Sequence, residues 1–250
     1  MNIGIIGLGL IGGSLAKSIK SATSHQVYAI DIDSETMMFA RMSGAIDGIL
    51  DENTIKECDT ILLALNPTPA IRWVKENAEM IKNTATVIDM CGVKRGVCKE
   101  LSAVAQASGF HYIGGHPMAG KERGGFVNAC NDLFHGASMI LTPDEYTDIN
   151  TLEKIKDLFT DIGFANLTFT TPDEHDRIIA YTSQLAHITS GAYVKSPTAT
   201  ERRGFSAGSF KDMTRVARLD ENMWTELFLA NSDYLADELE IFIKKSEAEE

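Results

Sequence analysis

The chain has 250 residues, of which 44% are hydrophobic and 23% are charged, as in an ordinary globular protein with a sizeable core. Lysine and arginine number 23 against 35 acidic residues, so the formal net charge is -12. This balance argues against a nucleic-acid partner and against an anionic membrane surface, because both attract basic surfaces.

A signal peptide, a membrane span and a disulfide framework are not expected. The apolar stretch at residues 3–15 holds five glycines and follows no positive residue. The longest apolar run elsewhere, residues 61–65, is too short to cross a bilayer. The cysteines form no Cys-x-x-Cys pair and no cluster with histidine, so we expect thiols, no bound metal and a cytoplasmic protein.

The first two thirds of the chain alternate between short apolar segments and helical patterns. This alternation predicts βαβ units and a parallel sheet. The predicted strands are residues 3–6, 26–30, 60–65, 86–90, 110–113, 138–141 and 166–169. The predicted helices are residues 12–21, 34–43, 69–82, 97–107 and 151–162.

The pattern changes near residue 171, after which no strand is predicted. Helices are expected over residues 173–195, 210–218 and 221–245. We therefore expect a Rossmann-type dinucleotide-binding domain over residues 1–171 and an all-α domain over residues 172–250. A region of about 80 residues is marginal alone. It should therefore need the first domain, a second subunit or both, and we expect a homodimer.

A Gly-x-Gly-x-x-Gly motif occupies residues 7–12, directly after the first predicted strand and at the start of a helix. Gly7 permits a tight turn, Gly9 lets the backbone approach a pyrophosphate, and Gly12 allows close packing of helix and strand. Leu10 and Ile11 lie directly before the predicted helix, whose N-terminal N–H groups attract phosphates, and they are expected to contact the cofactor. The motif predicts a dinucleotide site.

Asp31 ends the next predicted strand, about 20 residues after the glycines, where a carboxylate accepts hydrogen bonds from the ribose hydroxyls. Its charge would repel a 2′-phosphate, so NAD is favoured over NADP. Asp33 could share this role or cap the helix that follows it.

His116 lies in a Gly-Gly-His-Pro-Met-Ala-Gly segment after the strand predicted at residues 110–113. Ligands of open parallel sheets bind beyond the carboxyl ends of the strands. We therefore expect His116 to be displayed from a loop, either as a general base or as a loop residue bonded to backbone.

The helix predicted at residues 173–195 has one stripe of small and polar residues on which His187 is the largest side chain, with Gln184 at its edge. The opposite face, which includes Ile178 and Tyr181, is expected to be core. Because the polar stripe lacks Lys and Glu, we expect it to line a polar cavity rather than to face solvent.

Lys211 and Arg215 are four residues apart and face the same way on a predicted helix. A local pair of cations in an acidic protein suits a polyanionic small molecule, and Arg215 could hold a carboxylate. On spacing alone, a solvated basic face with an internal Asp212–Arg215 pair is favoured over a ligand site.

Taken together, these motifs resemble the prephenate/arogenate dehydrogenase family of tyrosine biosynthesis. The resemblance runs from residue 1 to about residue 245, and it is most specific in the His-Pro-Met-Ala-Gly and Phe-Lys-Asp-x-Thr-Arg elements, which occur in this order. The matching segments are residues 7–14, Asp-Met-Cys-Gly-Val-Lys at 89–94, His-Pro-Met-Ala-Gly-Lys-Glu at 116–122, Ser-Gln-Leu-Ala-His at 183–187, and Phe-Lys-Asp-Met-Thr-Arg at 210–215 followed by Trp224.

The resemblance implies a NAD-dependent oxidative decarboxylation of prephenate, with L-arogenate as the alternative substrate. His116 would bond the ring 4-hydroxyl as catalytic base, and Arg215 would bind a carboxylate. His187, Lys211, Glu122, Gln184 and Trp224 would belong to the substrate pocket. Many members carry serine where this chain has Gly92, and no ACT-like or chorismate mutase segment is evident, so the chain resembles the catalytic core.

Two other classes of protein share part of this pattern. A β-hydroxyacid or imine-type dehydrogenase would place a lysine where the polar stripe has His187. A redox-sensing regulator would bind NAD without needing His116 or Arg215.

Overall fold

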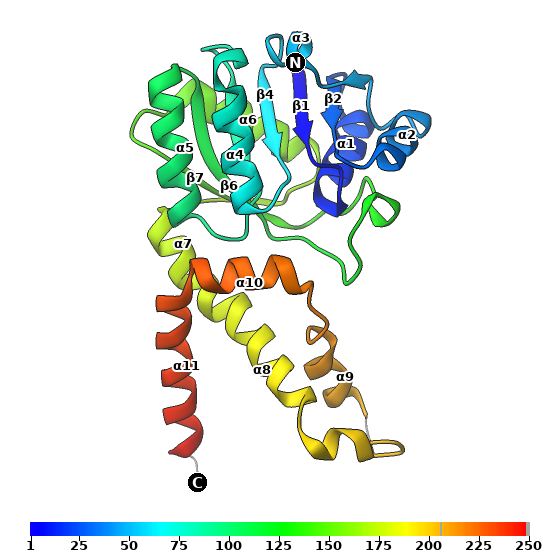
Figure 1. The fold of residues 1–250 in the computed structure, drawn as a ribbon, viewed down its shortest axis with the longest axis vertical. Helices are drawn as coiled ribbons and strands as arrows, with labels where there is room; N and C mark the ends of the chain where they lie inside the picture. The colour runs from blue at the N-terminus through cyan, green and yellow to red at the C-terminus, as the bar shows by residue number, and fades with distance from the viewer. Residues whose placement is uncertain (206, 249–250) are drawn as a thin grey trace. The chain divides into compact units, whose positions relative to one another are not determined.

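The computed structural model describes residues 1–205 and 207–248, so residues 249 and 250 of the expected helical domain lie outside it. The chain divides into two compact units, Met1–Pro172 and Asp173–Glu250. The first unit is an α/β sandwich and the second is helical (Figure 1). The predicted fold class is therefore confirmed.

The first unit is built on one sheet with strand order β3-β2-β1-β4-β5-β6-β7-β8. Its strands carry apolar residues on both faces, as expected where helices cover both sides. The strands are β1 (Asn2–Ile6), β2 (Gln26–Ile30), β3 (Gly48–Ile49), β4 (Thr60–Leu63), β5 (Thr86–Asp89), β6 (His111–Pro117), β7 (Ser138–Pro143) and β8 (Asn166–Phe169).

One pair of strands departs from the predicted parallel arrangement. β6 and β7 are antiparallel, with His116 opposite Ile140, whereas the other neighbouring strands are parallel. The connection at residues 118–137 holds only the 3₁₀ turn Phe126–Asn128 and no crossover helix of the kind that joins parallel strands.

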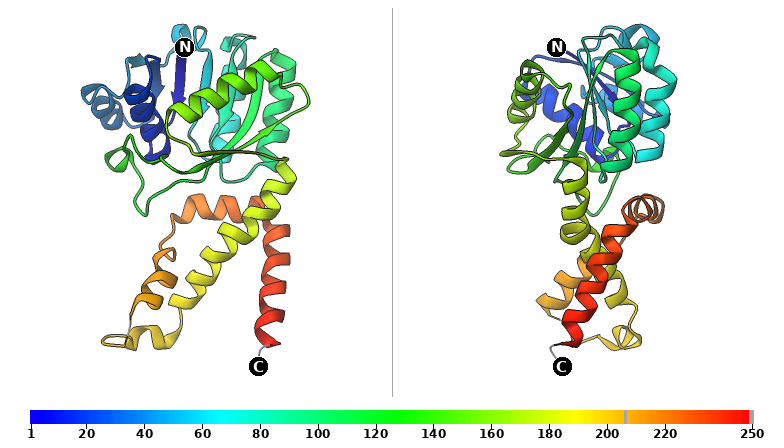
Figure 2. Two further views of the ribbon diagram at one scale, coloured as in Figure 1. Left: turned by 180° about the vertical axis from the view of Figure 1, so that it is seen from behind. Right: turned by 90° about the vertical axis from the view of Figure 1, so that its left-hand side faces the viewer.

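Helices cover both faces of the sheet, which is seen edge-on in the right-hand view of Figure 2 with α1 and α6 on one side and α4 and α5 on the other. Leu15, Ile19, Leu158 and Phe159 from α1 and α6 pack into one core with Ile88 and other strand residues. The helices are α1 (Leu10–Ala22), α2 (Ser34–Met42), α3 (Glu52–Ile55), α4 (Pro67–Asn77), α5 (Arg95–Ser108) and α6 (Ile149–Asp161). The short elements β3 and α3 were not predicted.

The helix expected at residues 173–195 consists of α7 (Pro172–Ile179), a π-helical segment (Ala180–Leu185) and α8 (Ala186–Val194). A π-helical segment leaves the regular 3.6-residue period, and such segments are frequent at functional sites. It is followed by a 3₁₀ turn (Pro197–Glu201) and α9 (Gly208–Arg215).

The single long helix predicted at residues 221–245 is wrong. The chain forms α10 (Glu221–Ala230) and α11 (Ser232–Glu247), separated by the fully buried Asn231 at φ -128°. The Asn231 amide donates hydrogen bonds to the Asp176 carbonyl oxygen at 2.8 Å and to Gln184 Oε1 at 2.9 Å. These tertiary bonds stabilise a break that helical periodicity does not reveal.

The burial of the two faces of the helix at residues 172–194 agrees with the prediction only in part: Leu185 of the apolar face is buried at 6% exposed. Ile178 and Tyr181, expected in the core, are 43% and 63% exposed in the single chain. Asp176, Gln184 and Ser190 from the polar stripe are buried instead. These residues of the polar stripe pack inside the helical unit, and the exposed part of the apolar face is left for another surface.

No helix in the described parts of the chain combines the length and the apolar character needed to cross a membrane.

Candidate active site

The turn between β1 and α1 needs glycine at two places. Gly7 has φ +86°, and a Cβ atom there would lie 2.6 Å from the Ala64 carbonyl oxygen. A Cβ atom on Gly12 would lie 1.9 Å from the Gly7 carbonyl oxygen, so only glycine lets α1 pass this close to the turn. The two residues give the turn the shape that the motif predicts.

Gly9 differs from its neighbours because a Cβ atom there would meet no protein atom within 4 Å. It is the N-cap of α1, so no N-cap side chain satisfies the N–H groups of the first turn, which contains Leu10 and Ile11. Open space before uncapped N–H groups suits an anionic pyrophosphate. The residues present therefore fit a bound dinucleotide.

Asp31 directly follows β2, beside the glycine turn. Its carboxylate accepts hydrogen bonds from the N–H groups of Leu8 at 2.6 Å and Asp33 at 2.9 Å. A carboxylate has about four acceptor positions, so the two bonds leave room for ribose hydroxyls. Asp33 accepts from the N–H groups of Glu35 and Thr36 and so caps α2.

His116 lies inside strand β6 and not in a loop after it, which corrects the prediction. The glycines before it are required by packing rather than by a turn. A Cβ atom on Gly114 would lie 2.2 Å from Thr142 Oγ1, and one on Gly115 would lie 2.6 Å from the Asp89 carbonyl oxygen. Pairing with β7 extends the strand through Pro117, so His116 stands on a hydrogen-bonded element near its carboxyl end.

Glu122 is exposed in the connection that follows β6. This connection is tied to the helix that begins at the glycine turn. Lys17 Nζ donates a hydrogen bond to the Ala129 carbonyl oxygen at 2.7 Å, and the Cys130 N–H donates to Ser14 Oγ at 3.2 Å. The segment carrying Glu122 and the dinucleotide helix thus form one packed body, an arrangement that the sequence did not indicate.

A buried ion pair between Asp89 and Lys94 lies at the carboxyl end of β5, and both side chains are fully buried. The sequence motif contains both residues, but no role was predicted for them. A lysine between the apolar residues Val93 and Val97, at the start of a helix that follows a buried strand, is the signal that could have singled them out.

In the helical unit, the ring of His187 lies against the indole of Trp224, with ring centroids 3.9 Å apart. His187 Nδ1 donates a hydrogen bond to the Ser183 carbonyl oxygen at 2.9 Å, because a carbonyl can only accept. Burial, together with the positive charge of Arg215, lowers the pKa of His187 below its usual value. The neutral ring therefore presents Nε2 as an acceptor.

Lys211 and Arg215 are exposed on α9, and in the part of the chain that the structure describes neither pairs with a carboxylate. Among the described residues, no ion pair joins Asp212 to Arg215, which was the alternative arrangement. The helical unit thus brings together Arg215, His187 and Trp224, a cation beside an aromatic surface.

Gln184, which the sequence places in the expected pocket, lies inside the helical unit. Its side chain is 1% exposed, its Nε2 donates to the Leu227 carbonyl oxygen at 3.3 Å, and its Oε1 accepts from Asn231. Both ends of the amide are satisfied within the helical unit, so Gln184 serves the packing of α10 and α11.

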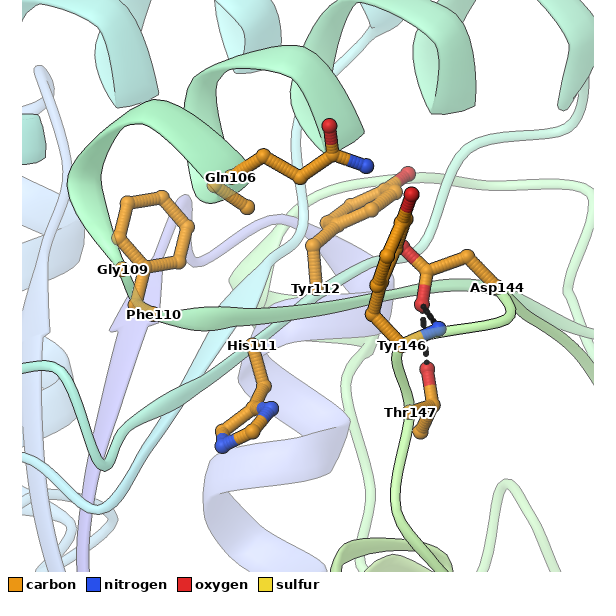
Figure 3. Close-up of a pocket in the computed structure, with 9 residues that line it drawn as sticks. Gln106, Gly109, Phe110, His111, Tyr112, Asp144, Tyr146 and Thr147 are labelled. Atoms are coloured by element: carbon orange, nitrogen blue, oxygen red, sulfur yellow. Dashed lines mark hydrogen bonds between the residues drawn. The ribbon is translucent and has the colours of Figure 1, made fainter.

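A separate hollow of about 280 Å³ lies at the other end of β6, lined by His111, Tyr112, Asp144 and Tyr146 among others (Figure 3). His111 begins β6 and His116 is five residues further on, roughly 16 Å along an extended strand. The hollow is therefore distinct from the candidate site at the carboxyl end of the strand.

Among residues 1–205 and 207–248, no group of three or more His, Cys, Asp and Glu side chains is arranged to hold a metal ion.

Residues 15–166 match the family described as "Prephenate dehydrogenase, nucleotide-binding domain", and residues 171–249 match "Prephenate dehydrogenase, dimerization domain". The chain belongs to the prephenate dehydrogenase family. The resemblance drawn from the sequence motifs is confirmed.

Individual relatives agree with this assignment. Prephenate dehydrogenase of Bacillus subtilis (strain 168) is 31% identical over 250 residues, which cover 96% of this chain and 67% of that protein. A crystal structure of A. aeolicus prephenate dehydrogenase with hydroxyphenyl propionate and NAD+ has a TM-score of 0.88 at 28% identity, covering 99% of this chain and 88% of the other. Synechocystis arogenate dehydrogenase has a TM-score of 0.84 at 25% identity, covering 99% and 90%.

Proposed function

We propose that this chain is a NAD-dependent dehydrogenase that converts prephenate to 4-hydroxyphenylpyruvate with release of CO₂. The observation that carries the proposal is a dinucleotide turn, Gly7 to Gly12, on the same sheet as His116 at the carboxyl end of β6. Membership of the prephenate dehydrogenase family supports it.

Gly7, Gly9, Gly12 and Asp31 would hold the cofactor, with the first turn of α1 at its phosphates. When bound, NAD⁺ supplies the acceptor for the hydride that leaves ring C4. Asp31 disfavours a 2′-phosphate through its negative charge, so we propose NAD rather than NADP.

His116 is proposed as the general base. As hydride leaves C4, the C4 hydroxyl becomes more acidic, and a neutral imidazole that accepts its proton lowers the barrier. A well-placed base of this kind contributes about 10²–10⁴ in rate. A strand position suits this role because a hydrogen-bonded strand holds its side chains more precisely than a loop does.

Arg215 and Lys211 are proposed to bind the carboxylates of the dianionic substrate, since neither cation is neutralised by a described carboxylate. Arg215 can hold a carboxylate through two parallel hydrogen bonds. His187 Nε2 and the Trp224 indole would complete the substrate surface of the helical unit. Glu122 is proposed as a further residue that binds the substrate.

We propose that the working form is a homodimer built by the helical unit. Its exposed apolar residues, Ile178, Tyr181, Ile241, Phe242 and Ile243 among them, form the kind of surface that a second subunit covers. The match to a dimerization domain supports this assembly. We also propose a cytoplasmic enzyme, in keeping with four cysteines that are free thiols.

L-arogenate is the second candidate substrate, because Synechocystis arogenate dehydrogenase is a structural relative. The test mixes the protein with NAD⁺ and either prephenate or arogenate, follows NADH absorbance, and identifies the product by chromatography. We expect faster turnover with prephenate. No NADH with either compound would refute the proposed function.

A further inference from the structure

The ion pair between Asp89 and Lys94 is unusual because both charges are removed from water. Burying two charges costs free energy that their attraction repays only with good geometry and further hydrogen bonds, and an apolar pair of similar size is often as stable. Stability alone therefore gives weak reason to place a lysine here.

The further hydrogen bonds of Asp89 join two segments. Its carboxylate accepts from the Cys91 N–H at 2.9 Å, in the turn after β5. It also accepts from the Tyr112 hydroxyl at 2.6 Å and from the Gly115 N–H at 3.4 Å, both in β6. Gly115 is the residue directly before His116, so Asp89 links the turn after β5 to the backbone that carries the imidazole.

Lys94 lies on the same face of the sheet as His116. Side chains alternate along a strand, so Tyr112, Gly114 and His116 share one face of β6. A Cβ atom on Gly114 would lie 3.2 Å from Lys94 Cδ. The lysine stem thus packs against Gly114, the residue that lies between Tyr112 and His116 on this face of the strand.

Lys94 and Tyr112 both keep the protonated form in which they donate to Asp89. Burial is the largest single influence on the pKa of Lys94 and acts to lower it, but the neighbouring groups, with the Asp89 carboxylate first among them, together raise the pKa above its usual value. Burial, followed by the charge of Asp89, raises the pKa of the Tyr112 hydroxyl, which remains a donor. Asp89 therefore accepts from charged and neutral donors at once.

We propose that Asp89 and Lys94 are positioning residues for His116, and that they hold the end of β6 in the geometry that proton transfer requires. This inference rests on the proposed function, in which His116 is the base. A catalytic group must be held within about 0.5 Å of its productive position by the residues around it. Neither Asp89 nor Lys94 needs to touch the substrate to do this.

The decisive variant changes both residues, Asp89→Asn with Lys94→Met. Asp89→Asn alone leaves the buried Lys94 cation without its carboxylate, and Lys94→Met alone leaves the buried Asp89 charge unpaired. Each single change is therefore expected to destabilise the fold. Changing both removes the charges together, and methionine fills the space of the lysine stem. We expect the double variant to melt closer to the wild type than either single variant does.

In the double variant, kcat should fall by about 10- to 100-fold, because small displacements of a catalytic group are costly. The substrate KM and the NAD⁺ Kd should stay within about twofold, since the change acts only in the transition state. Amide hydrogen exchange should become faster at Gly115 and His116, and this readout does not depend on activity.

The matched control removes an exposed ion pair from the same unit, Lys75→Met with Glu100→Gln. Lys75 and Glu100 are 2.6 Å apart between α4 and α5, and about half of each side chain is exposed. We expect wild-type kcat and wild-type exchange at Gly115 and His116. An equal loss of kcat in this control would overturn the inference.

Unchanged kcat, or unchanged exchange at Gly115 and His116, in the double variant would also overturn it. Failure of the proposed function has a different signature: wild-type protein inactive with prephenate and arogenate, or fully active His116→Asn. In that case the exchange rates still report whether the pair holds the end of β6.

Discussion

The carboxylate of Asp31 accepts a hydrogen bond from the Leu8 N–H at 2.6 Å, so the residue at the end of β2 also holds the glycine turn after β1. Replacing Asp31 with alanine would therefore remove a proposed ribose contact and loosen the turn at the same time. Asparagine keeps one acceptor oxygen and a similar shape, and so separates the charge from the hydrogen bond.

Asp31→Asn should shift the cofactor preference towards NADP⁺, because the charge that repels a 2′-phosphate is lost while the turn keeps an acceptor. The measurement is kcat/KM for NAD⁺ and NADP⁺ in both proteins. Asp33→Asn, which alters only the α2 cap, is the control and should keep the wild-type ratio. A wild-type enzyme that already prefers NADP⁺ would show that Asp31 has been misinterpreted.

His116→Asn should lower kcat by about 10²-fold or more, with little change in substrate KM, because its contribution belongs to the transition state. It should also remove the acidic limb of the pH–rate profile, since an amide does not titrate there. His111→Asn, at the opposite end of β6, provides the matched control. Near-normal kcat with the acidic limb intact would make another group the base, and His187 would be examined next.

Arg215→Ala should act mainly on KM for prephenate, because Arg215 holds a carboxylate that is charged before the reaction begins. The expected loss is about 1.5–3 kcal/mol, as for a hydrogen bond to a charged group. NAD⁺ affinity, measured by direct titration, should not change. If kcat falls and KM does not, Arg215 acts in the transition state and its proposed role is wrong.

The pKa of His187 should rise in Arg215→Gln, because the cation that opposes its protonation is removed while its burial remains. NMR titration of the ring measures this without substrate. Lys211→Gln removes the neighbouring cation of α9 and should leave the pKa of His187 unchanged. A rise of equal size in both variants would mean that net charge, and not Arg215 itself, is responsible.

Because the pKa of His187 is lowered in the folded chain, the free energy of unfolding should depend on pH. Below the ordinary value of 6.5 the unfolded chain binds a proton at His187 more readily than the folded chain does. The contribution of His187 to the free energy of unfolding is therefore complete above pH 6.5 and is lost as the pH falls towards its folded-state pKa. Urea midpoints of the wild type and of His187→Gln across this range should converge as the pH falls.

Ile241→Asp should dissociate the proposed dimer, because Ile241 is 52% exposed in the single chain and a buried charge at an interface is costly. Sedimentation at micromolar concentration should give twice the chain mass for the wild type. A wild-type mass near 27.3 kDa would refute the dimer. Ile149→Asp, at an isoleucine of the first unit that is 67% exposed, should leave the mass unchanged.

Local spacing was enough to determine the dinucleotide turn and the residue at the end of β2. Gly12 is required because its Cβ would meet the Gly7 carbonyl oxygen, five residues earlier in the chain. Gly7 is required by its own φ of +86° and by the Ala64 carbonyl oxygen, which follows the neighbouring strand β4. Such constraints act on backbone geometry directly, so the residue types and their spacing carry them. The alternation of strands and helices, and with it the fold class, follows from the same local periodicities.

Only the tertiary structure decided which surfaces meet. The break at Asn231 depends on acceptors supplied by Asp176 and Gln184, more than 40 residues away. Periodicity divides the helix at residues 172–194 into two faces, but which face is buried depends on what packs against it, and here the polar face is covered by its own unit. His116 lies in a strand because β7 pairs with this part of β6, and Lys94 can be buried because Gly114 has no side chain where the lysine stem packs. Each outcome is set by contacts between distant segments, whose free energy no single stretch of sequence contains.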